Sequence, residues 1–77
     1  MQKQNIQHIT RRYVNRVREC RLKAMLPKQE DLVERTGINR SVISALENNR
    51  IFLSSQYALI ISEALGCTLD DLFQKKT

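Results

Sequence analysis

The chain has 77 residues, of which 42% are apolar, and a formal net charge of +5. A chain of this length forms a single domain with a small core, and its apolar fraction excludes wholesale disorder. Because it contains only two glycines and one proline, helices are favoured over strands and turns. No apolar run approaches the roughly 18 residues of a membrane span, and no apolar secretory signal is present, so we expect a cytoplasmic protein.

Positive charge is concentrated in residues 1–28, where Glu19 is the only acidic residue among many lysines and arginines. A one-sided positive field suits a polyanion, with nucleic acid the first candidate and an anionic membrane surface the second. An ordinary solvated helix face is the alternative explanation. The two cysteines, Cys20 and Cys67, lack the spacing of metal ligands. We expect buried thiols in a reducing compartment, with a disulfide or redox switch as the alternative, and we expect no metal and no cofactor.

An amphipathic helix is predicted from Ile9 to the residues before Pro27, preceded by a polar arm. A stripe of apolar positions recurs every three or four residues, at Ile9, Tyr13, Val17, Cys20 and Ala24. This spacing is typical of one helix face, and the residue before a proline is biased out of the helical conformation. Pro27 can then occupy the first turn of a second helix, which Gly37 ends.

A third helix is predicted to begin after Asn39, a good N-cap residue, with Ile43 and Leu46 on its inner side. Ser54 or Ser55 then caps a fourth helix that Gly66 ends. Thr68 caps a short fifth helix, in which apolar residues that include Leu69, Leu72 and Phe73 point inward. The predicted fold is therefore all-α, with five helices.

The outer face of the third helix carries small and hydrogen-bonding side chains. These residues are Arg40, Ser41, Ser44, Ala45 and Asn48. A narrow face of this kind fits the major groove of DNA, because larger side chains would hold the backbone away from the base edges.

At this point the chain resembles a known family. The segment QEDLVERTGINRSVISALENNR is similar to the helix-turn-helix of phage-repressor-like regulators of the Cro/CI, or xenobiotic-response-element, family. NRVRECR at 15–21 and SSQYALIISEALGCTLDDLF at 54–73 resemble the flanking helices. The resemblance implies a compact five-helix DNA-binding domain at residues 15–77, with the helix-turn-helix at helices two and three. Residues 1–14 are expected to form an N-terminal arm and helix extension. Asn49 replaces the usual glycine, and we expect it to stop the third helix in a left-handed conformation.

The resemblance also implies roles for individual residues. Base contacts are expected from Arg40, Ser41, Ser44 and Ala45. Contacts to DNA phosphates are expected from Lys28, Gln29, Asn48 and Arg50. A buried ion pair is expected between Arg21 and Glu47, and a dimer interface is expected at Leu72 and Phe73. The interface prediction also rests on surplus apolar residues near the C-terminus, and the region of Ile9 and Tyr13 is the alternative interface.

The function expected from these features is sequence-specific binding to double-stranded DNA by a transcriptional regulator. We expect a repressor that binds an inverted repeat as a homodimer, with the third helix in the major groove. Repression is the simplest mechanism, because 77 residues leave no room for a separate activating or ligand domain, and activation through contact with the polymerase is the alternative. A small-molecule effector and a membrane partner are not expected. The alternative is a protein-interaction module, such as an antitoxin or a helical adaptor. An enzyme is not expected, since the sequence has no nucleophile–base pair and no phosphate-binding loop.

Overall fold

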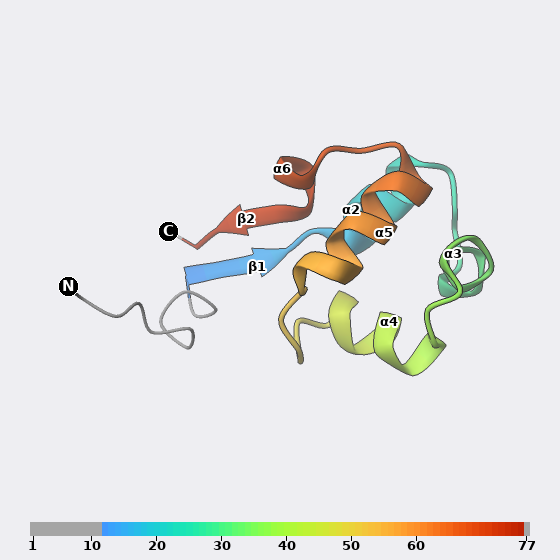
Figure 1. The fold of residues 1–77 in the computed structure, drawn as a ribbon, viewed down its shortest axis with the longest axis horizontal. Helices are drawn as coiled ribbons and strands as arrows, with labels where there is room; N and C mark the ends of the chain where they lie inside the picture. Colours follow the sequence, from blue (N-terminus) through green and yellow to red (C-terminus); the bar gives the residue numbers. More distant parts are fainter. Residues whose placement is uncertain (1–11, 77) are drawn as a thin grey trace.

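The structure is a computed structural model, and it describes residues 12–76. These residues form five helices and one two-stranded sheet (Figure 1). In chain order, the elements are β1 (Tyr13–Asn15), α2 (Val17–Lys23), α3 (Gln29–Thr36), α4 (Arg40–Glu47), α5 (Ser55–Leu65), α6 (Leu69–Leu72) and β2 (Phe73–Lys75). The five predicted helices are therefore present, whereas the prediction of an all-α fold misses the sheet.

The prediction of a first helix starting at Ile9 is wrong in the described part of the chain. Tyr13 to Asn15 is a strand, and the helix begins at Val17. The strand pairs antiparallel with β2, with Val14 opposite Gln74. The three- to four-residue spacing of apolar positions predicts a helix, but pairing with the distant β2 overrides that local pattern. The polar arm that precedes Ile9, and Ile9 itself, lie outside the described residues.

The ends of the helices follow the local signals in the sequence. The side chain of Asn39 accepts a hydrogen bond from the N–H of Ser41 and caps α4, as predicted. Gly37 adopts a left-handed conformation (φ 74°) at the end of α3. Like Asn39, Ser54 and Thr68 cap a helix with the side-chain oxygen. Ser54 accepts from the N–H of Tyr57 at the start of α5, and Thr68 accepts from the N–H of Asp71 at the start of α6. Pro27 is the exception, because α3 begins at Gln29 and leaves the proline in the preceding loop.

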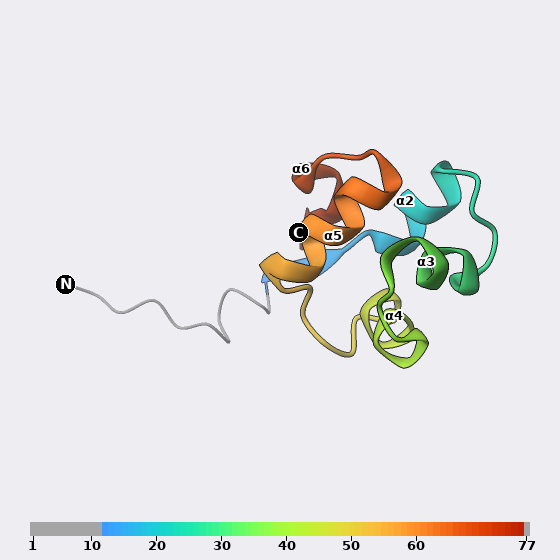
Figure 2. The ribbon, with the colours of Figure 1, turned by 45° about the vertical axis from the view of Figure 1, so that its right-hand side comes forward.

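The core joins the helices into one unit. Among the described residues, the largest almost fully buried side chains are those of Val17, Leu32, Ile43, Leu46, Leu53, Ile61 and Leu72. Leu69, by contrast, was expected to point inward but is 44% exposed. In the two views of Figures 1 and 2, α4 lies at one edge of the fold and α6 at the opposite edge, with α5 between them. Within α4, Arg40 and Ser41 are exposed, and Ser44 and Ala45 are half-buried.

Asn15 ties the sheet to the C-terminal end of α4. Its side-chain amide donates to the carbonyl oxygen of Leu46 at 2.6 Å, and its own N–H donates to Oδ1 of Asn49 at 2.9 Å. Its Oδ1 accepts from the N–H of Val17 at 3.1 Å. Asn15 is 8% exposed, so these bonds satisfy a polar group that would otherwise be costly to bury.

Among the described helices, none is long and apolar enough to cross a lipid bilayer.

Candidate nucleic-acid interface

The segment from α3 to α4 is a helix, a tight turn and a second helix. Gly37 turns the chain, and Ile38 is 6% exposed and fixes the turn to the core. Ile43 and Leu46 are fully buried on the inner side of α4. The first of the predicted base-contacting residues, Arg40, is also the first residue of this helix.

The outer face of α4 and the start of α3 together form a shallow surface hollow. The hollow is lined by Gln29, Arg40, Ser41 and Ser44. Three of these residues were predicted to contact bases and one to contact a phosphate, and the fold brings all four together. Ala45 is half-buried on the same helix. The hollow therefore presents one long cation, two hydroxyls and an amide at a single exposed surface.

Arg40 is held loosely at the rim of this hollow. Its Nε lies 3.3 Å from Oε1 of Glu30, which is the second residue of α3. The side chains are 66% and 56% exposed, respectively, so water screens the pair strongly. An exposed pair of this kind exchanges partners at small cost, which leaves the guanidinium available to another acceptor.

The residues just after α4 fold back against its last turn. The side-chain amide of Asn48 donates to the carbonyl oxygen of Ser44 at 2.8 Å, and Nη2 of Arg50 lies 3.4 Å from the Ser44 hydroxyl oxygen. Asn49 has φ 54°, which confirms the predicted left-handed stop. The two predicted phosphate-contacting residues Asn48 and Arg50 therefore lie beside the hollow, next to Ser44.

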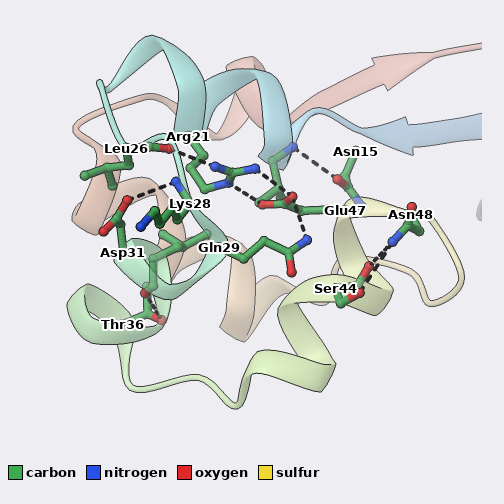
Figure 3. A network of polar contacts seen from close by, with 12 residues as sticks. Asn15, Arg21, Leu26, Lys28, Gln29, Asp31, Thr36, Ser44, Glu47 and Asn48 are labelled. Atoms are coloured by element: carbon green, nitrogen blue, oxygen red, sulfur yellow. Dashed lines mark hydrogen bonds and ion pairs between the residues drawn. The ribbon is translucent and has the colours of Figure 1, made fainter.

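A buried polar cluster holds α4 on the side opposite the hollow. Oε2 of Glu47 accepts from Nε of Arg21 at 2.7 Å, and Oε1 accepts from Arg21 Nη2 and Gln29 Nε2, both at 3.1 Å (Figure 3). Arg21 Nη1 also donates to the carbonyl oxygen of Leu26 at 2.8 Å. The Arg21 and Glu47 side chains are 5% and 2% exposed. The expected ion pair is thus present and joins α2 to α4, and the hydrogen bond from Gln29 joins α3 to them.

Three predicted site residues, Lys28, Leu72 and Phe73, have contacts of their own within the fold. Lys28 is exposed and precedes α3 as its N-cap residue, and its N–H donates to Oδ2 of Asp31 at 2.9 Å. Leu72 is fully buried in the core, so this side chain has no exposed surface to offer a second chain. Phe73 is half-buried and begins β2, where its ring lies 6.0 Å from that of Phe52.

Sequence reasoning missed two residues that shape the site, Glu30 and Asn15, and one further contact of Gln29, which was itself predicted to contact a phosphate. Glu30 pairs with Arg40, Asn15 anchors the end of α4, and Gln29 bonds to Glu47 as well as facing the hollow. Asn15 lies two residues before α2 begins, and an asparagine near the start of a helix was a usable sign of a cap or anchor. The other two contacts depend on which helix faces meet, and the sequence carries no local sign of them.

Residues 14–77 match a protein-family model described as a helix-turn-helix domain. A comparison with curated proteins finds no match. The matched range contains α2 to α6 and the hollow on α4 with every residue that lines it. A helix-turn-helix is a DNA-binding motif of transcriptional regulators, whose second helix enters the major groove. The chain belongs to the helix-turn-helix domain family.

Proposed function

We propose that this protein is a sequence-specific regulator that binds double-stranded DNA through α4 and acts as a repressor of the Cro/CI type. The observation that carries the proposal is the hollow on α4, where Arg40, Ser41 and Ser44 lie together with Gln29 at an exposed surface. The buried cluster around Glu47 supports it, because base readout requires a helix that is held in a fixed position.

The proposed base contacts follow from side-chain length and chemistry. Arg40 reaches a guanine edge, whose two acceptors match the fork of a guanidinium. Ser41, Ser44 and Ala45 are small, so the backbone of α4 can come close to the groove floor. The Ser41 hydroxyl donates to Oδ1 of Asn39 at 2.7 Å, which leaves its oxygen lone pairs to accept a bond from a base.

The proposed phosphate contacts lie on both sides of the hollow. Lys28 and Gln29 lie at the start of α3, where the positive end of the helix dipole favours an anion. Gln29 uses one amide hydrogen on Glu47 and has a second one for a phosphate oxygen. Asn48 and Arg50 act at the other side, just after α4. In this arrangement the phosphates position the protein and the bases specify the site.

Salt dependence of binding to a labelled duplex tests the DNA proposal. With about six phosphate contacts, affinity falls roughly a thousandfold between about 50 and 200 mM salt, because bound cations are displaced from the DNA. Sites selected from random DNA by the wild-type protein identify the operator, and excess nonspecific duplex serves as competitor. A salt-independent affinity, or a selection that yields no preferred sequence, contradicts the proposal.

We also propose that the protein binds an inverted repeat as a homodimer, with the two α4 helices roughly 34 Å apart. The candidate interface is an apolar patch formed by Ile51 and Phe52, which are 43% and 42% exposed, together with the half-buried Tyr13, Val14 and Phe73. This patch combines the predicted Phe73 with the alternative region around Tyr13. Apart from Phe73, its residues line one hollow between the sheet and the loop after α4.

Phe52→Asp tests the dimer proposal, because it places a charge in the patch. Sedimentation equilibrium is expected to show a shift from dimer to monomer, and affinity for the full inverted repeat falls towards that for one half-site. Leu59→Asp is the matched control, since Leu59 is 55% exposed on α5 outside the patch. A wild-type protein that is monomeric on DNA and alone removes the homodimer. That result would favour the alternative, in which the apolar patch binds another protein.

A further inference from the structure

The two cysteines lie together at a place that the DNA proposal does not use. Cys20 is on α2 and is 8% exposed, and Cys67 is half-buried in the turn between α5 and α6. Both line one small hollow, whose charged rim consists of Arg16, Glu19, Lys23 and Asp71. Both thiols are free in this structure.

The two thiols differ in their surroundings. The Cys20 thiol points to the carbonyl oxygen of Asp71 at 3.4 Å and is enclosed by the core. Burial raises the pKa of Cys20 to about 11, and the neighbouring Cys67 thiol and the Asp71 carboxylate add to this rise, while Arg16 opposes it. Cys67 is the more accessible of the two. A reagent that enters the hollow therefore meets Cys67 first.

We propose that Cys67 and Cys20 form a modification site for low-molecular-weight disulfides of the glutathione class. The Cys67 thiolate attacks one sulfur of the reagent, forms a mixed disulfide and releases one thiolate. The Cys20 thiolate then attacks the Cys67 sulfur and displaces the second thiolate. The two cysteines are oxidised to one internal disulfide, and the reagent is reduced to two thiols, which take up both protons.

The position of this bond gives it a structural consequence. It joins α2 to the turn before α6, and the chain between the two cysteines contains α3, α4 and α5. The whole helix-turn-helix is thus enclosed in a covalent loop. Such a loop restricts the unfolded chain, so the oxidised protein is expected to melt at a higher temperature, by about 10 °C or more.

The rate of the second step, attack by Cys20 on the mixed disulfide, is expected to depend strongly on pH. Attack by Cys20 requires its thiolate, so closure of the internal disulfide is expected to accelerate about tenfold for each pH unit between roughly 7 and 10. The charged side chains around this thiol are those of Arg16, Glu19 and Lys23 at α2 and that of Asp71 on α6. In this second step Cys67 is already bound in the mixed disulfide, so the attacking thiolate is that of Cys20.

The test uses the full reduced chain and glutathione disulfide as the probe, with acid quenching and intact-mass spectrometry followed by peptide mapping. At pH 7 the expected first product is a glutathione adduct on Cys67, and at pH 9 this adduct gives way quickly to an internal Cys20–Cys67 disulfide. Cys20→Ala should retain the adduct at both pH values. Cys67→Ala should leave Cys20 unmodified while the protein is folded.

Three outcomes overturn the proposal. The first is an adduct on wild-type Cys67 that persists at pH 9, and the second is a product that joins only separate chains. The third is modification that begins at Cys20. Each is visible in peptide maps of the wild-type protein, so the result does not depend on whether the variants fold. Circular dichroism before and after oxidation gives the shift in melting temperature.

Discussion

The charged groups on the inner side of α4 are buried and paired, whereas those on its outer side are exposed to solvent. On the inner side, the Glu47 carboxylate is 2% exposed and accepts three hydrogen bonds from Arg21 and Gln29. On the outer side, Arg40 is 66% exposed and has one carboxylate, that of Glu30, at 3.3 Å. The inner group cannot lose a partner without leaving a charge buried, whereas the outer group can replace its partner with water or DNA. The contacts on the inner side hold α4 in place, and the exposed pair on the outer side can open at small cost.

Removing the inner carboxylate is expected to have the largest effect. Glu47→Ala should lower the free energy of unfolding by about 3–5 kcal/mol, because the Arg21 guanidinium is left buried without its partner. Urea unfolding followed by circular dichroism measures the loss. Glu30→Ala is the matched control, since it removes the exposed carboxylate and should cost less than about 0.5 kcal/mol. Equal effects of the two variants would show that the inner pair is open to solvent.

The contrast also separates what the sequence can predict from what it cannot. The end of α3 and the limits of α4 were predictable, because Gly37, Asn39 and Asn49 act through their own backbone and their nearest neighbours. The Arg21–Glu47 pair was predictable only through the family resemblance, since the two residues lie on different helices. The pair between Arg40 and Glu30 has no local sign, because it depends on how closely α3 and α4 approach.

The sheet was unpredictable for a related reason. The apolar residues Tyr13 and Val17 fit a helical repeat, and local periodicity cannot reveal that Val14 pairs with Gln74 at the other end of the chain. That pairing also brings Phe73 beside Phe52, which forms part of the apolar patch. Contacts between distant parts of the sequence thus determine the candidate dimer surface, while local signals determine where α4 begins and ends.

On the outer side, Arg40→Ala is expected to change recognition and not stability. If Arg40 pairs with a guanine, its loss weakens binding to the selected site by about 1–3 kcal/mol and relaxes the preference at one position in each half-site. Arg50→Ala should instead weaken binding to all sequences alike, because a phosphate contact carries no sequence information. Selection from random DNA with both variants distinguishes the two roles. Full preference at every position for Arg40→Ala would assign Arg40 to a phosphate.

Met25 and Asn49 both adopt the left-handed backbone conformation, but only Asn49 uses its side chain to hold another part of the fold. Met25 has φ 63° and is 84% exposed, and Asn49 has φ 54° but accepts a hydrogen bond from the N–H of Asn15. Met25→Gly should stabilise the protein by about 0.5–1 kcal/mol, because glycine adopts this conformation without a Cβ clash. Asn49→Gly should give no such gain, since it removes the bond to Asn15. Thermal and urea unfolding of both variants measure the difference.

The smallest expected effect concerns the competition for Arg40. Glu30 holds the guanidinium in the free protein, and its carboxylate lies at the surface that would approach the DNA phosphates. Glu30→Gln removes that charge and frees Arg40, so affinity for DNA is expected to rise by about twofold to fivefold at low salt. The gain should shrink as salt increases, because the exposed pair is already screened. Glu34→Gln, one turn further along α3, controls for the change in net charge alone, and binding curves at several salt concentrations compare the two variants. A weaker affinity for Glu30→Gln would mean that Glu30 positions Arg40 for DNA instead of competing with it.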